Sequence, residues 1–123
     1  MIIGMGIDFV SVSRITHWLQ NEALCQRFFH PEELRYIHSS GVQAARSLAA
    51  RFAAKEAFVK ALGSGFAGLF LKDIRVKNEQ SGRPQLILEG SAFDAMIGIG
   101  ARWVHMSLTH EGDLAAAQVI LEG

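Results

Sequence analysis

Residues 42–62 read VQAARSLAARFAAKEAFVKAL, and this stretch decides the fold. It contains neither glycine nor proline, and alanine, a strong helix former, is frequent. Four large apolar side chains form a stripe along one helix face. They are Leu48, Phe52, Val59 and Leu62. Gly63 follows, and a glycine after the last turn is a common helix stop. We therefore predict one long helix over residues 42–62.

The segments before and after this helix have the alternation and the turn residues of strands. The predicted strands are residues 2–12, 73–77, 84–88, 102–109 and 114–122. The first is short and rich in β-branched residues, which favours a strand despite two glycines. Asn78, Ser81 and Gly82 supply a turn for one hairpin, and residues 111–113 supply a turn for a second.

Shorter helices fill the remaining segments. Ser13 is a candidate N-cap, and Pro31 followed by two glutamates is a helix-start signal. A weaker helix is predicted for residues 91–99. The order strand, helices, hairpin, helix, hairpin indicates an α+β fold. We expect a single small domain over residues 1–123, with an antiparallel sheet packed on one long helix and several short helices.

Composition excludes several classes of protein. The 123 residues fit one domain, half of them are apolar, and 12 basic residues balance 12 acidic ones. A formal net charge of zero gives no overall attraction to nucleic acid or to an anionic membrane. Cys25 alone forms no internal disulfide, which suits a reducing compartment, and no zinc-ligand spacing occurs. The apolar run 61–71 is too short to cross a bilayer. We expect a cytoplasmic protein with no membrane or nucleic-acid partner.

Two patterns bring carboxylates into positions where they could do chemistry. Asp8 lies within an apolar strand, where an ionised carboxylate is costly unless it is paired or binds a cation. A turn-capping role at a strand end is the alternative. Glu56 and Lys60 are four residues apart and share one helix face. A solvated surface pair is the ordinary interpretation of such spacing.

Glycines and polar strand residues give two further patterns. Gly63, Gly65 and Gly68 spell G-x-G-x-x-G, but they follow a helix, whereas a dinucleotide fingerprint follows a strand and opens a helix. Such a loop can still bring backbone N–H groups near phosphate. Polar side chains alternate along the strand 102–109, so they share a face that meets water or a ligand. They are His105, Ser107 and Thr109. No nucleophile elbow or oxyanion element accompanies them, which argues against a catalytic triad.

Five segments together resemble a known family. They are GIDFV at 6–10, RFAAKEAFVKALGSG at 51–65, GRPQLILEG at 82–90, VHMSLTHE at 104–111 and AAAQVILE at 115–122. In this order they are similar to the holo-(acyl carrier protein) synthase family of 4′-phosphopantetheinyl transferases. The second segment is the most specific, because it combines an arginine, a Lys-Glu pair and a second lysine before a Gly-x-Gly stop. The chain length resembles the short, stand-alone group.

This resemblance implies a reaction. Phosphopantetheine would pass from coenzyme A to a serine of apo acyl carrier protein, with adenosine 3′,5′-bisphosphate released, magnesium required and fatty acid biosynthesis served. Asp8 and Glu56 would hold Mg²⁺, and Lys60 would neutralise phosphate charge beside them. The two carboxylates and Lys60 are the catalytic candidates. Either Glu56 or a metal-bound hydroxide would accept the serine proton.

The resemblance also implies the binding residues and the assembly. The candidate coenzyme A contacts are Arg51, Lys60, Gly63, Gly65, Pro84, His105, Ser107 and Thr109. Arg14 matches a basic position at which the family meets its acidic carrier, and Arg27 is a second candidate. Family members of this length are homotrimers with active sites between subunits.

Two other classes of function compete with this one. A non-catalytic module that binds coenzyme A or a nucleotide would use the same glycines and basic residues, and its binding would be indifferent to Asp8. A structural oligomerisation domain would show no magnesium-dependent ligand binding.

Overall fold

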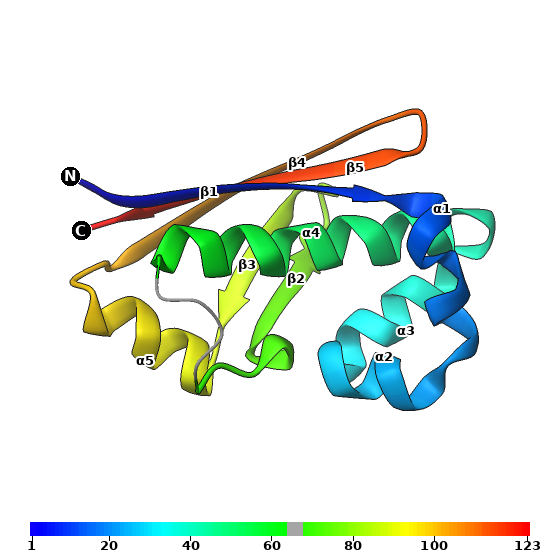
Figure 1. The fold of residues 1–123 in the computed structure, drawn as a ribbon, viewed down its shortest axis with the longest axis horizontal. Coiled ribbons are helices and arrows are strands. Elements are labelled where there is room, and N and C mark those ends of the chain that lie inside the picture. The colour runs from blue at the N-terminus through cyan, green and yellow to red at the C-terminus, as the bar shows by residue number, and fades with distance from the viewer. Residues whose placement is uncertain (64–67) are drawn as a thin grey trace.

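The computed structural model describes residues 1–63 and 68–123 and confirms the α+β prediction (Figure 1). In chain order the elements are β1 (Ile2–Ser11), α1 (Val12–Ile15), η1 (Thr16–Gln20), α2 (Glu22–Phe28), α3 (Pro31–Ser39), η2 (Gly41–Gln43), α4 (Ala44–Leu62), η3 (Leu71–Asp73), β2 (Ile74–Asn78), β3 (Pro84–Leu88), α5 (Gly90–Gly98), β4 (Trp103–Glu111) and β5 (Leu114–Glu122). The η elements are single 3₁₀ turns or short 3₁₀ helices.

Two antiparallel sheets surround the long helix. β5 is the middle strand of the order β1-β5-β4, and β2 pairs with β3 in a separate two-stranded sheet. Both predicted hairpins are therefore present. Figure 1 shows the three-stranded sheet along one side of α4, with α2 and α3 near one end of the molecule and α5 near the other. The chain ends meet, because the Met1 ammonium donates to the Gly123 carbonyl at 2.8 Å.

The long helix begins two residues later than predicted. Gly41 has a φ of +57°, and the following residues form a 3₁₀ turn before α4 starts at Ala44. The side chain of Val42 is 97 % exposed, so no packing draws this turn into the helix. The C-terminal end agrees with the prediction, because Gly63 adopts the left-handed conformation with φ +77° directly after Leu62.

The core lies between α4 and the three-stranded sheet. Ala53, Ala57 and Phe58 of α4 are fully buried, as are Val119 and Leu121 of β5. The alanines let the sheet approach the helix closely. No helix in the described residues is long and apolar enough to cross a membrane.

Candidate functional site

Two glycines of β1 bring its backbone against α4. A Cβ built on Gly4 would overlap the carbonyl oxygen of Ala61, and one built on Gly6 would overlap that of Ala57. These glycines are thus required for the close approach of strand and helix, and do not weaken the strand prediction. Asp8 follows Gly6 on the same face of the strand. The approach therefore directs the Asp8 carboxylate toward the last turns of α4.

Lys60 meets Asp8 at this contact. Its Nζ donates to Asp8 Oδ1 at 2.8 Å and approaches the Ile7 carbonyl oxygen at 3.4 Å. The hydrogen bond to Asp8, and then the charge of Asp8, raise the pKa of Lys60, so the ammonium stays charged. The lysine side chain is still 54 % exposed, whereas that of Asp8 is 16 % exposed. Lys60 is accordingly free to turn toward a ligand.

Glu56 lies one turn before Lys60 and completes the group. Partial burial, followed by the negative charge of Asp8, raises the pKa of the Glu56 carboxyl. The two carboxylates thus repel each other, and the nearby charge of Lys60 offsets this only in part. A further cation would relieve this repulsion. The magnesium-binding role that the family resemblance implies for Asp8 and Glu56 stays a prediction.

The donor set fits magnesium. No group of three or more His, Cys, Asp or Glu that could hold a metal occurs in residues 1–63 and 68–123. Mg²⁺ is commonly held by one or two carboxylates, with water and substrate phosphate as the other ligands. Asp8 and Glu56, from a strand and a helix, match this pattern.

The glycine motif after α4 is only partly described. The Gly63 N–H donates to the carbonyl oxygens of Val59 and Lys60, so this amide ends the helix and is not free to bind phosphate. Gly63 as a coenzyme A contact stays a prediction, and its own amide is not the group that would make it. Gly65 lies outside the described residues.

An apolar pocket of about 590 Å³ opens beside Glu56. Its apolar walls are Phe28, Phe52, Leu69, Phe70 and Leu71, and two cations, Arg27 and Lys72, also line it. The guanidinium of Arg27 lies 5.6 Å from the centre of the Phe28 ring. Arg27, predicted to dock the carrier, is therefore a pocket residue as well.

Arg51 lies away from this group. It is nine residues before Lys60, which places it about 180° around the helix. Arg51 is 4 % exposed and donates to Ser47 Oγ at 2.8 Å and to Asn78 Oδ1 at 2.5 Å. Burial lowers the pKa of its guanidinium. Its Nε is buried and has no hydrogen-bond partner in the described part of the chain.

Arg51 instead lines a second pocket, of about 400 Å³. Pro84 and Thr109 line it too, so three of the predicted coenzyme A contacts do come together. Arg46 and His110 add positive or potentially positive groups that the sequence prediction missed. Nothing in the local spacing identified them, because the pocket joins α4 to the β2–β3 turn and to β4.

The prediction of one polar face on β4 is confirmed. His105, Ser107 and Thr109 are exposed, and the residues between them are partly buried. His105 pairs across the sheet with Ile120, which pairs with Met5. This is the sheet face opposite to Asp8, since Met5 and Asp8 differ by an odd number of residues. His105 Nε2 lies 2.9 Å from Glu122 Oε1 and lowers the pKa of Glu122 through this hydrogen bond.

A single copy of the chain therefore does not surround one phosphate with all the predicted residues. Asp8, Glu56 and Lys60 form one group, Arg51 belongs to another pocket, and His105 lies across the sheet.

Comparisons with known proteins match this chain over its length. The model of the 4′-phosphopantetheinyl transferase superfamily matches residues 4–116. The chain belongs to this superfamily. It is 56 % identical to a holo-[acyl-carrier-protein] synthase of Treponema denticola over 100 % of both chains. The crystal structure of the Neisseria meningitidis synthase superposes with a TM-score of 0.89 at 33 % identity, covering 100 % of each chain.

A synthase of Bacillus anthracis, solved in complex with CoA (3′,5′-ADP), is also similar. The TM-score is 0.82 at 34 % identity, over 99 % of this chain and 97 % of that one. The family prediction and the fold prediction are thus confirmed, and this chain is a transferase by family.

The carrier-docking candidate of this phosphopantetheinyl transferase is at the start of α1. Arg14 is exposed. Asp113 holds the segment before Arg14 in place like a clamp, because its carboxylate accepts hydrogen bonds from the hydroxyls of Ser11 and Ser13 at 2.7 Å each. These hydrogen bonds lower the pKa of Asp113. The clamp holds the start of α1 on the β4–β5 turn and so limits where Arg14 can reach.

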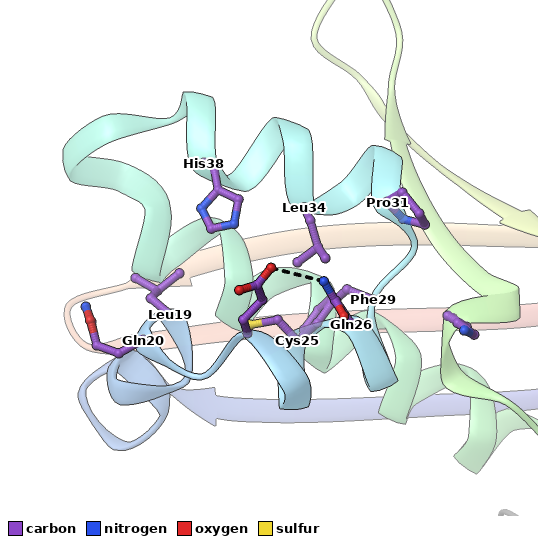
Figure 2. Close-up of a pocket in the computed structure, with 10 residues that line it drawn as sticks. Leu19, Gln20, Cys25, Gln26, Phe29, Pro31, Leu34 and His38 are labelled. Atoms are coloured by element: carbon purple, nitrogen blue, oxygen red, sulfur yellow. Dashed lines mark hydrogen bonds between the residues drawn. The ribbon is translucent and has the colours of Figure 1, made fainter.

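Another cavity, of about 720 Å³, lies between α2 and α3 (Figure 2). Leu34, Phe29 and Leu19 provide apolar lining. Cys25 also lines it, with its thiol donating to the Trp18 carbonyl at 3.1 Å, and burial raises the pKa of this thiol. Of the predicted site residues that the structure describes, none lines this cavity.

Proposed function

We propose that the protein is a holo-(acyl carrier protein) synthase. It transfers 4′-phosphopantetheine from coenzyme A to a serine hydroxyl of apo acyl carrier protein and releases adenosine 3′,5′-bisphosphate. The observation that carries this proposal is the group of Asp8, Glu56 and Lys60 at the β1–α4 contact, beside an apolar pocket. The names of the similar synthases support it.

Asp8 and Glu56 would hold Mg²⁺, which when bound offsets the negative charge of the diphosphate. Lys60 is exposed enough to exchange its bond with Asp8 for one with a phosphate oxygen. During transfer the serine oxygen forms a bond to the β-phosphorus, and the bond from that phosphorus to the leaving phosphate breaks. Glu56 is our candidate to accept the serine proton, because a raised pKa suits a general base.

The apolar pocket beside Glu56 suits the pantetheine arm, which joins the β-phosphate and is uncharged at neutral pH. The Arg51 pocket suits the opposite, nucleotide end of coenzyme A. The Nε of the buried Arg51 guanidinium has no hydrogen-bond partner among the described residues, and Arg46 and His110 also line this pocket. Arg51 and Lys60 lie on opposite sides of α4. One coenzyme A molecule would therefore place its pantetheine end in the pocket of one copy of the chain and its nucleotide end in the Arg51 pocket of another copy.

The outer face of the sheet supports such an assembly. Met5, Ile7 and Phe9 of β1 are large, apolar and exposed on one face. Contiguous apolar surface of this kind marks an interaction site. We propose a homo-oligomer with shared sites, and the family resemblance favours a homotrimer. A cytoplasmic location and a role in fatty acid biosynthesis are parts of the same proposal.

The test is mass spectrometry of purified apo carrier protein incubated with the enzyme, coenzyme A and Mg²⁺. A gain of ~340 Da on the carrier, the size of one phosphopantetheine group, is the expected result. EDTA and the Asp8→Ala variant should each abolish the gain. Binding of coenzyme A without any gain would indicate a non-catalytic binding module, and the absence of magnesium-dependent binding would indicate a structural domain.

A further inference from the structure

Lys55 precedes Glu56 in the chain, yet its side chain points into the protein. It is fully buried, and its ammonium group has three acceptors. Nζ donates to Glu33 Oε1 at 2.7 Å, to the Leu71 carbonyl at 3.0 Å and to the Ile74 carbonyl. An ammonium group has three N–H donors, so all of them are used.

Glu33 extends this connection to two more segments. Its Oε2 accepts from the Val76 N–H at 3.0 Å, and its Oε1 accepts from the His30 N–H at 3.0 Å. The Glu33 side chain is also fully buried. One ion pair therefore joins α3, α4 and the start of β2.

Stability alone does not account for this ion pair. Moving two charges out of water is costly, and apolar residues of similar volume often stabilise a core as well or better. The distinctive property of the pair is its geometry, because the ammonium holds two backbone carbonyls of residues 71–74 at a defined distance from α4. An apolar side chain would pack there but would not fix those carbonyls.

Residues 71–74 lead directly to the pocket beside Glu56. Leu71 and Lys72 line it together with Phe52 and Glu56 of α4. The other edge of the segment is tied to α5, since the Phe70 N–H donates to Ser91 Oγ at 2.9 Å. Lys55 supplies the tie to α4.

We propose that Lys55 is a positioning residue that sets the width of the pocket beside Glu56 by holding the backbone of residues 71–74. This proposal rests on the proposed function, in which that pocket takes the pantetheine arm of coenzyme A. Among the described residues, the hydrogen bonds of Lys60 go to Ile7 and Asp8 and not to residues 71–74. Loss of the ammonium should therefore weaken coenzyme A binding more than the chemical step.

Two variants test the proposal. Lys55→Met removes the ammonium but leaves the Glu33 charge buried and unpaired. The double variant Lys55→Met with Glu33→Gln also removes that charge and keeps an acceptor for Val76, so it should fold even if the single variant does not. Leu121→Ala is the matched control, because this buried β5 residue lines neither pocket and its truncation also lowers stability.

The measurements are KM for coenzyme A and kcat, calorimetric Kd for coenzyme A with Mg²⁺, and amide hydrogen exchange over residues 69–76. We expect the double variant to raise KM and Kd about tenfold with kcat within about twofold, a scale consistent with a small misplacement of a binding wall. Exchange at residues 71–74 should accelerate. The Leu121→Ala control should keep the wild-type KM and Kd despite a lower melting temperature.

The outcomes separate the two proposals. A double variant with wild-type KM and Kd would overturn the positioning role, while wild-type transfer would leave the proposed function intact. Absence of transfer by the wild-type protein would overturn the proposed function, and the calorimetric Kd would still decide the role of Lys55. Wild-type protein that does not bind coenzyme A would overturn both.

Discussion

Gly6→Ala tests the close contact on which the site depends. The new Cβ would lie 2.7 Å from the Ala61 amide nitrogen and nearer still to the Ala57 carbonyl oxygen, whereas ordinary contacts begin at 3.4 Å. The obstructing atoms belong to the backbone of α4 and cannot rotate away. To lengthen the distance from the new Cβ to the Ala61 nitrogen from 2.7 Å to 3.4 Å, β1 must move away from the helix by at least 0.7 Å.

The expected cost has two parts. Overpacking a well-packed core costs about 1–3 kcal/mol, or roughly 4–12 °C in Tm for a chain of this size. The withdrawal also carries Asp8 away from Lys60, to which it is bonded at 2.8 Å. A misplacement of about 1 Å at a reacting centre can cost a factor of about 100 in rate. We expect activity to fall much further than stability.

Differential scanning fluorimetry measures the loss of Tm, and the carrier-modification assay measures the loss of turnover. Gly98→Ala is the control, because a Cβ there meets no atom within 4 Å. Helix propensity predicts that this change is neutral or stabilising by up to about 1 kcal/mol. Wild-type Tm and turnover for Gly6→Ala would refute the inference that β1 lies directly on α4 at this point.

Three further predictions concern the site and its partners. Glu56→Gln should raise the Tm of the magnesium-free protein at neutral pH. A carboxyl whose folded pKa is raised contributes stability below its unfolded pKa and loses it as pH rises through the folded pKa. The Tm difference between Glu56→Gln and wild type should therefore shrink as pH falls toward the ordinary value of 4.5, and a difference constant across that range would contradict the raised pKa. Asp8→Ala and Arg51→Ala should each lose transfer activity, yet subunits of the two variants, mixed and reassembled, should recover part of it. A mixture as inactive as its components would argue against sites shared between copies. Arg14→Glu should raise KM for the acidic carrier at low salt, with KM for coenzyme A nearly unchanged. Equal damage to both KM values would indicate a disturbed active site instead.

Local patterns in the sequence were enough to predict both hairpins and the long helix. The predicted Ser13 cap was wrong, because α1 begins at Val12 with Ser11 at the N-cap position. Period-two alternation and turn residues located both hairpins, and an alanine-rich run closed by Gly63 located α4. The spacing of Glu56 and Lys60 placed both on one face, because residues four apart in a helix are neighbours. These features depend on residues close together in the chain, which is why they could be predicted from sequence.

Only the tertiary structure decided what each polar residue of α4 does. Other elements cover α4 on several sides, and Arg51 and Lys55 lie under them and are buried. Lys60 is exposed. The apolar periodicity of the helix does not distinguish these three residues. The burial of each depends on segments far away in the sequence, such as residues 71–78 for Arg51 and Lys55, and β1 for Lys60. The sequence by itself determined which elements form and which residues carry charge. The packing of distant elements determined which charges meet, because burial and the distances between side chains are properties of non-local contacts.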